Sequence, residues 1–154
     1  MIYTYYGSKD GLFDAVLDHH ITAAQDAVTL DATDLPGYVL QVFDFYRAHP
    51  HLVRLAMWQS LERPELMAAR PEVAMAMAGK AAAIREAQRM GRVASALPAE
   101  RLLEQILPLA HGSITAAAHA EAWTDQQRHD LGVAVGALVR PSTEPTEREG
   151  GGDT

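Results

Sequence analysis

The sequence contains no cysteine among its 154 residues, which excludes a disulfide framework, thiolate chemistry and a zinc site with cysteine ligands. It also lacks an apolar run of membrane-spanning length and a basic, apolar leader, so we expect a cytoplasmic protein that does not contact a membrane. Basic residues are fewer than acidic ones, 13 against 20, and the formal net charge is −7. A surface built mainly to bind phosphates is therefore not expected, and any contact with nucleic acid must be small and local.

Strict alternation of apolar and polar residues, the pattern of half-buried strands, is absent as well. Glycine and proline instead separate segments in which apolar residues recur at helical spacing. Apolar residues make up 48% of the chain, enough for one domain with a sizeable core. We predict an all-α fold, a bundle of about six helices joined by short connections.

Capping residues indicate where these helices begin and end. Ser8 and Asp34 are suited to cap the first two helices, and Thr124 with Gln127 forms a capping box for the last one. Gly91 suits the left-handed position that follows a helix. The predicted helices span residues 9–30, 35–49, 50–62, 71–90, 98–122 and 125–140.

Two further features interrupt this pattern. Pro108 falls inside the fifth predicted helix, where the missing N–H predicts a kink or a break. Residues 141–154 are rich in Ser, Thr, Pro, Glu and Gly, so we expect them to be disordered.

A motif at the start of the chain resembles a known family. Residues 2–13 read IYTYYGSKDGLF: an aliphatic residue and Tyr, spaced aromatics, a short turn, Lys with an acidic residue, then apolar residues. This pattern resembles the end of the helix-turn-helix of TetR-type transcriptional regulators and the start of their next helix. The order and lengths of the predicted helices also fit that family's regulatory domain. The resemblance implies the end of a DNA-binding region at residues 1–12, a ligand-binding and dimerisation domain at 13–140, and a tail at 141–154.

By resemblance, Tyr3, Tyr5 and Lys9 contact DNA phosphates, which positions a protein without reading bases. The alternative is that the aromatic side chains only pack against the next helix and that Lys9 is a solvated residue at its start. The family pattern places two helices and most of the recognition helix, with the base-reading residues, before Ile2. Met1 is then either an internal residue taken for a start or the mark of a truncation, and we expect no specific operator binding by the 154 residues alone.

The resemblance also implies an internal cavity for a small apolar or amphipathic effector. Aromatic and Met side chains give such a cavity an adaptable apolar wall, and a Gln or His can orient a polar group. The alternative is that the same side chains fill an ordinary core. The predicted pocket residues are Phe43, Tyr46, Met57, Trp58, Gln59, Met75, Leu107 and His111.

A homodimer is predicted through the last two long helices. The first of them has two apolar stripes, and small residues allow close helix approach, so two helices from each copy can form a four-helix bundle about a two-fold axis. The alternative is packing within one chain. The predicted interface residues are Ala110, Ser113, Ala117, Leu131, Ala134 and Leu138.

The seven histidines do not predict a metal site. His19 and His20 are adjacent, so they point to different helix faces, and no Glu-x-x-His pair occurs. A nucleophile elbow and a Gly-rich phosphate loop are also absent, so we predict no catalytic residue, no enzyme activity and no cofactor.

These observations favour a TetR-type transcriptional regulator, a repressor that a small effector releases from DNA by shifting the first long helix. Its expected partners are a second copy, the effector, and operator DNA provided that the missing helices are present. The alternative is a truncated helical dimer that binds a ligand or another protein but not DNA.

Overall fold

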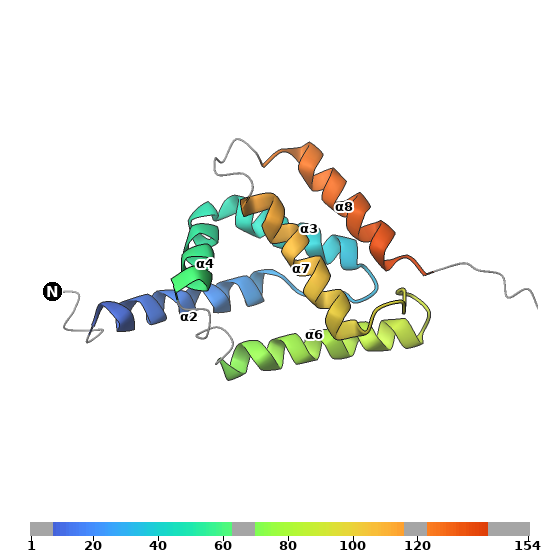
Figure 1. Cartoon of the computed structure of the whole chain (residues 1–154), viewed down its shortest axis with the longest axis horizontal. Helices are drawn as coiled ribbons and strands as arrows, with labels where there is room; N and C mark the ends of the chain where they lie inside the picture. Colours follow the sequence, from blue (N-terminus) through green and yellow to red (C-terminus); the bar gives the residue numbers. More distant parts are fainter. Residues whose placement is uncertain (1–7, 63–69, 116–122, 142–154) are drawn as a thin grey trace, which may run out of the picture.

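The computed structural model describes residues 8–62, 70–115 and 123–141. These ranges contain helices and no strand, which confirms the predicted all-α class. In chain order the helices are α2 (Lys9–Ala27), α3 (Leu35–Ala48), α4 (Pro50–Glu62), α6 (Pro71–Arg89), α7 (Ala99–Thr115) and α8 (Asp125–Val139) (Figure 1). None of these helices is long and apolar enough to cross a membrane. The expected disorder of the tail concerns residues 142–154, which lie outside the described residues.

Helix ends follow local capping chemistry. At the start of α3, the N–H of Gly37 donates to Oδ1 of Asp34 at 2.9 Å. The capping box of Thr124 and Gln127 opens α8 as predicted. Gly91, with φ of +68°, follows the end of α6 in the left-handed conformation that suits glycine. The sequence therefore predicts these boundaries closely.

Two details differ from the prediction. α2 ends at Ala27 instead of near residue 30, because Val28 takes an extended conformation with φ of −128°. The side chain of Val28 is thereby buried, 7% exposed, in the core. Of the two outcomes predicted at Pro108, a break does not occur, since α7 continues through it to Thr115.

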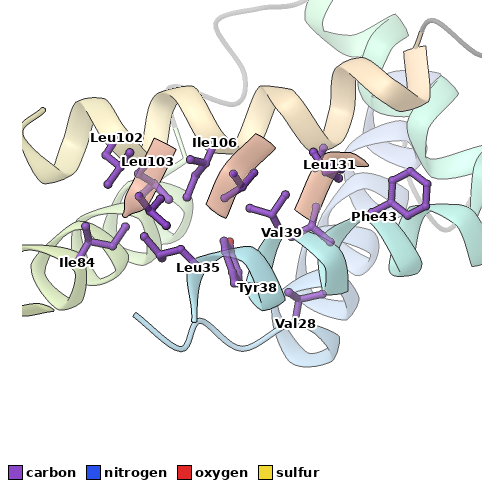
Figure 2. Close-up of a cluster of buried hydrophobic side chains, with 14 of the residues drawn as sticks. Val28, Leu35, Tyr38, Val39, Phe43, Ile84, Leu102, Leu103, Ile106 and Leu131 are labelled. Atoms are coloured by element: carbon purple, nitrogen blue, oxygen red, sulfur yellow. The ribbon is translucent and has the colours of Figure 1, made fainter. Parts of the chain in front are cut away.

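The core lies around α3, which α6, α7 and α8 cover (Figure 2). Tyr38 of α3 is 2% exposed, and the ammonium group of Lys80 in α6 lies 5.3 Å from the centre of its ring. The side chains with at most 1% exposure in this cluster come from all four helices: Leu35, Val39, Phe43, Ile84, Leu102, Ile106, Ala110 and Val135.

Two glycines lie where α8 crosses α3. A Cβ atom at Gly132 would be 3.3 Å from Cδ1 of Leu40, and one at Gly136 would be 3.9 Å from Cγ of Pro36. The contact at Gly132 is tighter than an ordinary van der Waals contact, so the absence of a side chain there lets the two helices approach closely.

Candidate functional site

Among the described residues, α2 makes few contacts with the other helices. None of its described side chains is buried. Phe13 of α2 contacts Trp58 of α4, with the ring centres 4.7 Å apart and an interplanar angle of 67°. In Figure 1, α4 extends from the end of α3 to α2. α2 therefore contacts α4 through an edge-to-face aromatic pair, and none of its described side chains is fully buried in this contact.

An ionic cluster forms the second attachment of α2. Arg70, the N-cap residue of α6, forms ion pairs with Asp14 and Asp18 of α2 and with Glu72 of its own helix. The Arg70 side chain is only 14% exposed, whereas Asp14 and Asp18 are 43% and 57% exposed. This cluster ties the middle of α2 to the start of α6.

Four of the predicted pocket residues lie at least partly in the interior. Phe43 is fully buried, and its ring centre is 5.5 Å from that of Trp123. Gln59 is 2% exposed. Tyr46 and Leu107 are partly buried against the core cluster, and burial raises the pKa of the Tyr46 hydroxyl above its ordinary value.

Three other predicted pocket residues are exposed. Met57, Trp58 and Met75 have exposed fractions of 39%, 45% and 74%. The side chain of His111 lies outside the described part of the chain. The effector cavity therefore stays a prediction, with its interior residues contributed by α3, α4 and α7.

The predicted dimer residues divide into two groups. Ala110 and Leu131 are buried in the protomer's own core, with exposed fractions of 0% and 5%. Ala134 and Leu138 face outward on α8, and Leu138 is 41% exposed. The Ser113 side chain and the whole of Ala117 lie outside the description.

A groove between α7 and α8 contains the outward Leu138. Its volume is about 520 Å³. Leu97 and Leu109, which line it with Leu138, are each 37% exposed. Arg101 and Gln105 complete the lining. Apolar side chains from three separate segments thus gather on one exposed surface, which we call the α7–α8 groove.

The predicted DNA-contact residues cannot be placed. Tyr3, Tyr5 and the side chain of Lys9 lie outside the described part of the chain. Ser8 is described, and its Oγ accepts the N–H of Gly11 at 3.0 Å, so α2 begins at the predicted N-cap. The phosphate contacts remain a prediction.

A second groove, between α3 and α8, was not foreseen. It encloses about 660 Å³, and two ion pairs lie beside one another in its lining: Asp44 with Arg128 and Arg47 with Asp125. The sequence contains a signal for this arrangement, because an acidic residue stands three positions before an arginine once in α3 and once in α8. When two such helices run antiparallel, each acidic residue can lie opposite the arginine of the other helix. The hydrogen bond from Arg47 lowers the pKa of Asp125.

In the described ranges, no three His, Asp or Glu side chains gather as they would around a metal ion.

Residues 34–140, which include every helix from α3 to α8, match the family described as tetracyclin repressor-like, C-terminal domain. The chain belongs to this family. Its described fold has the all-helical architecture that the resemblance implied, and α2 precedes the matched region.

Two relatives of this tetracyclin repressor-like chain come from Streptomyces coelicolor. The HTH-type transcriptional repressor SCO4008 is 32% identical over 115 residues, which is 74% of this chain and 60% of the relative. The chain thus spans less than two thirds of that relative's length. The crystal structure of SCO4942, named there as a candidate transcriptional regulator, is 32% identical with a TM-score of 0.76, covering 92% of this chain and 79% of the other.

Proposed function

We propose that this chain is the effector-binding and dimerisation part of a cytoplasmic transcriptional repressor that a small apolar or amphipathic molecule releases from DNA. The family match over residues 34–140, joined to a relative named as a transcriptional repressor, carries the proposal. The motif at residues 2–13 supports it, because it resembles the end of a helix-turn-helix directly before α2.

α2 is proposed to transmit the effector signal. It follows the DNA-binding motif in sequence, and among the described residues the Phe13–Trp58 pair and the Arg70 cluster join it to other helices. An element with few buried contacts moves at low free-energy cost. An effector bound beside α4 would shift α2 and thereby change the spacing of two DNA-reading heads.

The second head is supplied by a second copy of the chain. We assign the homodimer contact to the α7–α8 groove, because Leu97, Leu109 and Leu138 expose apolar surface there. In a dimer with a two-fold axis, the same surface of each copy faces the other. Two copies that meet at the α7–α8 groove would therefore bring four helices together as a bundle.

The deciding experiment restores the residues encoded in frame before Ile2 and selects bound fragments from a random DNA duplex library. We expect enrichment of a short inverted repeat with nanomolar-range affinity, and no enrichment by the 154 residues alone. A longer frame without a helix-turn-helix, or one that enriches nothing, would overturn the repressor proposal in favour of a helical ligand-binding or interaction protein that does not bind DNA.

A further inference from the structure

The interior face of α4 carries a side-chain amide nitrogen that has no hydrogen-bond partner among the described residues. Gln59 is 2% exposed and is the one buried polar residue in the described part of the chain. Its Nε2 forms no hydrogen bond with any described residue. A buried amide donor without an acceptor costs free energy that an apolar side chain of similar size would not cost. The fold alone therefore gives no reason for a glutamine at this position.

Gln59 shares its face of α4 with a buried leucine. Leu52 lies seven residues earlier on α4, so the two side chains share one face of the helix. Leu52 is 5% exposed, yet among the described buried apolar residues it alone is outside the core cluster. The neighbouring residue Trp58 contacts Phe13 of α2. Leu52 and Gln59 thus form a buried face of α4, next in sequence to the residue that contacts α2.

Two other buried atoms also lack a hydrogen bond in the described residues, Oδ1 of Asp14 and Nε of Arg70. They differ from Gln59 because both side chains already belong to one ionic cluster, in which Nη2 of Arg70 lies 3.9 Å from Oδ1 of Asp14. Nε2 of Gln59 is therefore the buried neutral donor that has no hydrogen-bond partner in the described structure.

We propose that this buried face of α4 binds the effector and that Nε2 of Gln59 donates a hydrogen bond to it. The inference rests on the proposed function and adds the chemical class of the ligand: an apolar body that carries a neutral acceptor oxygen, as in a ketone or an ester. A neutral acceptor fits better than a carboxylate, because the largely buried guanidinium group of Arg70 already faces Asp14 and Asp18 and the described residues bury no other basic side chain. Leu52 supplies apolar contact for the body of the ligand.

The test uses matched probes that differ in one acceptor group: benzophenone against diphenylmethane, and 2-acetylnaphthalene against 2-ethylnaphthalene. Dissociation constants are measured by tryptophan fluorescence for the full chain, for Gln59→Leu, and for Gln41→Leu. The last variant makes the same chemical change at an exposed position of α3. Trp58→Phe identifies the fluorescence that arises at the α2–α4 junction, against the background of Trp123.

We expect Gln59→Leu to bind the hydrocarbons as the natural chain does and to lose about tenfold in its preference for the ketones, while Gln41→Leu retains that preference. Without ligand, the melting temperature of Gln59→Leu should be equal to or above that of the natural chain, because an unused buried donor has been removed. An unchanged ketone preference in Gln59→Leu, no binding of either ketone, or a lower melting temperature of the ligand-free variant would overturn the inference. The DNA selection described above decides the repressor proposal independently of these results.

Discussion

Arg128 of α8 holds the carboxylate of Asp44 in α3 through two nitrogens, with Nε 2.8 and 3.0 Å from the two oxygens and Nη2 2.7 Å from Oδ2. One turn away, Arg47 of α3 pairs with Asp125 of α8 at 2.7 Å. Both pairs, and the contacts of the two glycines of α8 with α3, follow a single antiparallel register. The charges therefore favour the same alignment of the two helices as the close-packed glycines.

The ion pair between Arg128 and Asp44 should contribute little to the free energy of unfolding, but the effects of replacing its two residues should not be additive. The two side chains are 39% and 44% exposed, so solvent weakens the attraction between their charges. The bidentate geometry of the pair strengthens that attraction. A double-mutant cycle of Arg128→Gln and Asp44→Asn, measured by urea unfolding, should give a coupling free energy of about 0.5–1 kcal/mol at low salt. The coupling should decrease at high salt, and zero coupling at low salt would contradict the assignment.

Local chemistry explains why helix ends could be predicted from the sequence. Asp34, Gly91 and the Thr124–Gln127 box act on backbone groups within a few residues, so their effect is visible in the sequence. The end of α2 could not be predicted in this way. Val28 leaves the helix and is buried in a core built by residues distant in the chain.

In the candidate site, too, some features follow from the local sequence and others depend on tertiary packing. Helical spacing identifies the apolar faces, but it does not tell whether the chain itself or a partner covers a face. Ala110 and Leu131 are covered by the protomer's own core, whereas Leu138 on the same pair of helices is exposed. The sequence predicts Gln59 as a polar pocket residue. It does not predict that Nε2 of Gln59 is buried without a hydrogen-bond partner among the described residues, because that depends on how α4 packs.

Glycines with different surroundings should respond oppositely to alanine. A Cβ atom at Gly79, inside α6, meets no atom within 4 Å, so Gly79→Ala should raise the free energy of unfolding by about 0.5–1 kcal/mol through helix propensity. Gly91 has φ of +68°, so Gly91→Ala should lower it by about 1 kcal/mol. Urea unfolding of both variants measures the difference. Equal effects of the two changes would contradict the left-handed conformation at Gly91.

The turn before α3 should contribute an acid-sensitive stabilisation. Asp31 accepts hydrogen bonds from the hydroxyl and the N–H of Thr33 at 2.7 and 2.8 Å, and the side-chain bond, followed by the backbone bond, lowers the pKa of Asp31. A carboxyl pKa that is lower in the folded state stabilises the fold above the unfolded pKa of about 3.9. This contribution is lost as the pH falls through the folded pKa.

Thr33→Val removes the hydroxyl donor and should raise the pKa of Asp31 toward its unfolded value, which weakens the dependence of stability on pH in the acid range. Carboxyl NMR titration of Asp31 measures the shift. Thr29→Val, at an exposed position nearby, is the control and should leave that pKa unchanged. An unaltered pKa in Thr33→Val would show that the hydroxyl is not the main cause.

A charge in the α7–α8 groove should dissociate the proposed homodimer. Light scattering of the natural chain should give twice the chain mass of 16.7 kDa at micromolar concentration. Leu138→Glu should give a monomer, because burying an unpaired charge in an apolar contact costs several kcal/mol. Leu61→Glu places the same charge at an 80% exposed leucine of α4 and should leave the dimer intact. A monomeric natural chain would exclude the homodimer under these conditions.

The ionic cluster at Arg70 should control how firmly α2 is attached. Arg70→Met removes the positive charge that faces Asp14 and Asp18, two carboxylates one helical turn apart whose mutual repulsion then remains. Because both carboxylates are about half exposed, we expect a loss of about 1 kcal/mol in local stability, or roughly fivefold faster amide hydrogen exchange in α2. Exchange in the core helices α3 and α7 should change little, since their buried side chains do not depend on this cluster.

Arg89→Met is the matched control for this prediction, because Arg89 pairs with Glu86 within α6 and is 69% exposed. It should leave exchange in α2 unchanged. Uniformly faster exchange throughout Arg70→Met would mean that Arg70 supports the whole fold, and unchanged exchange would mean that the cluster contributes nothing to the attachment. A local effect limited to α2 would leave a helix that detaches without unfolding the core. That separation is what the proposed repressor requires, because its DNA-binding head can move only if α2 shifts while α3 to α8 keep their arrangement.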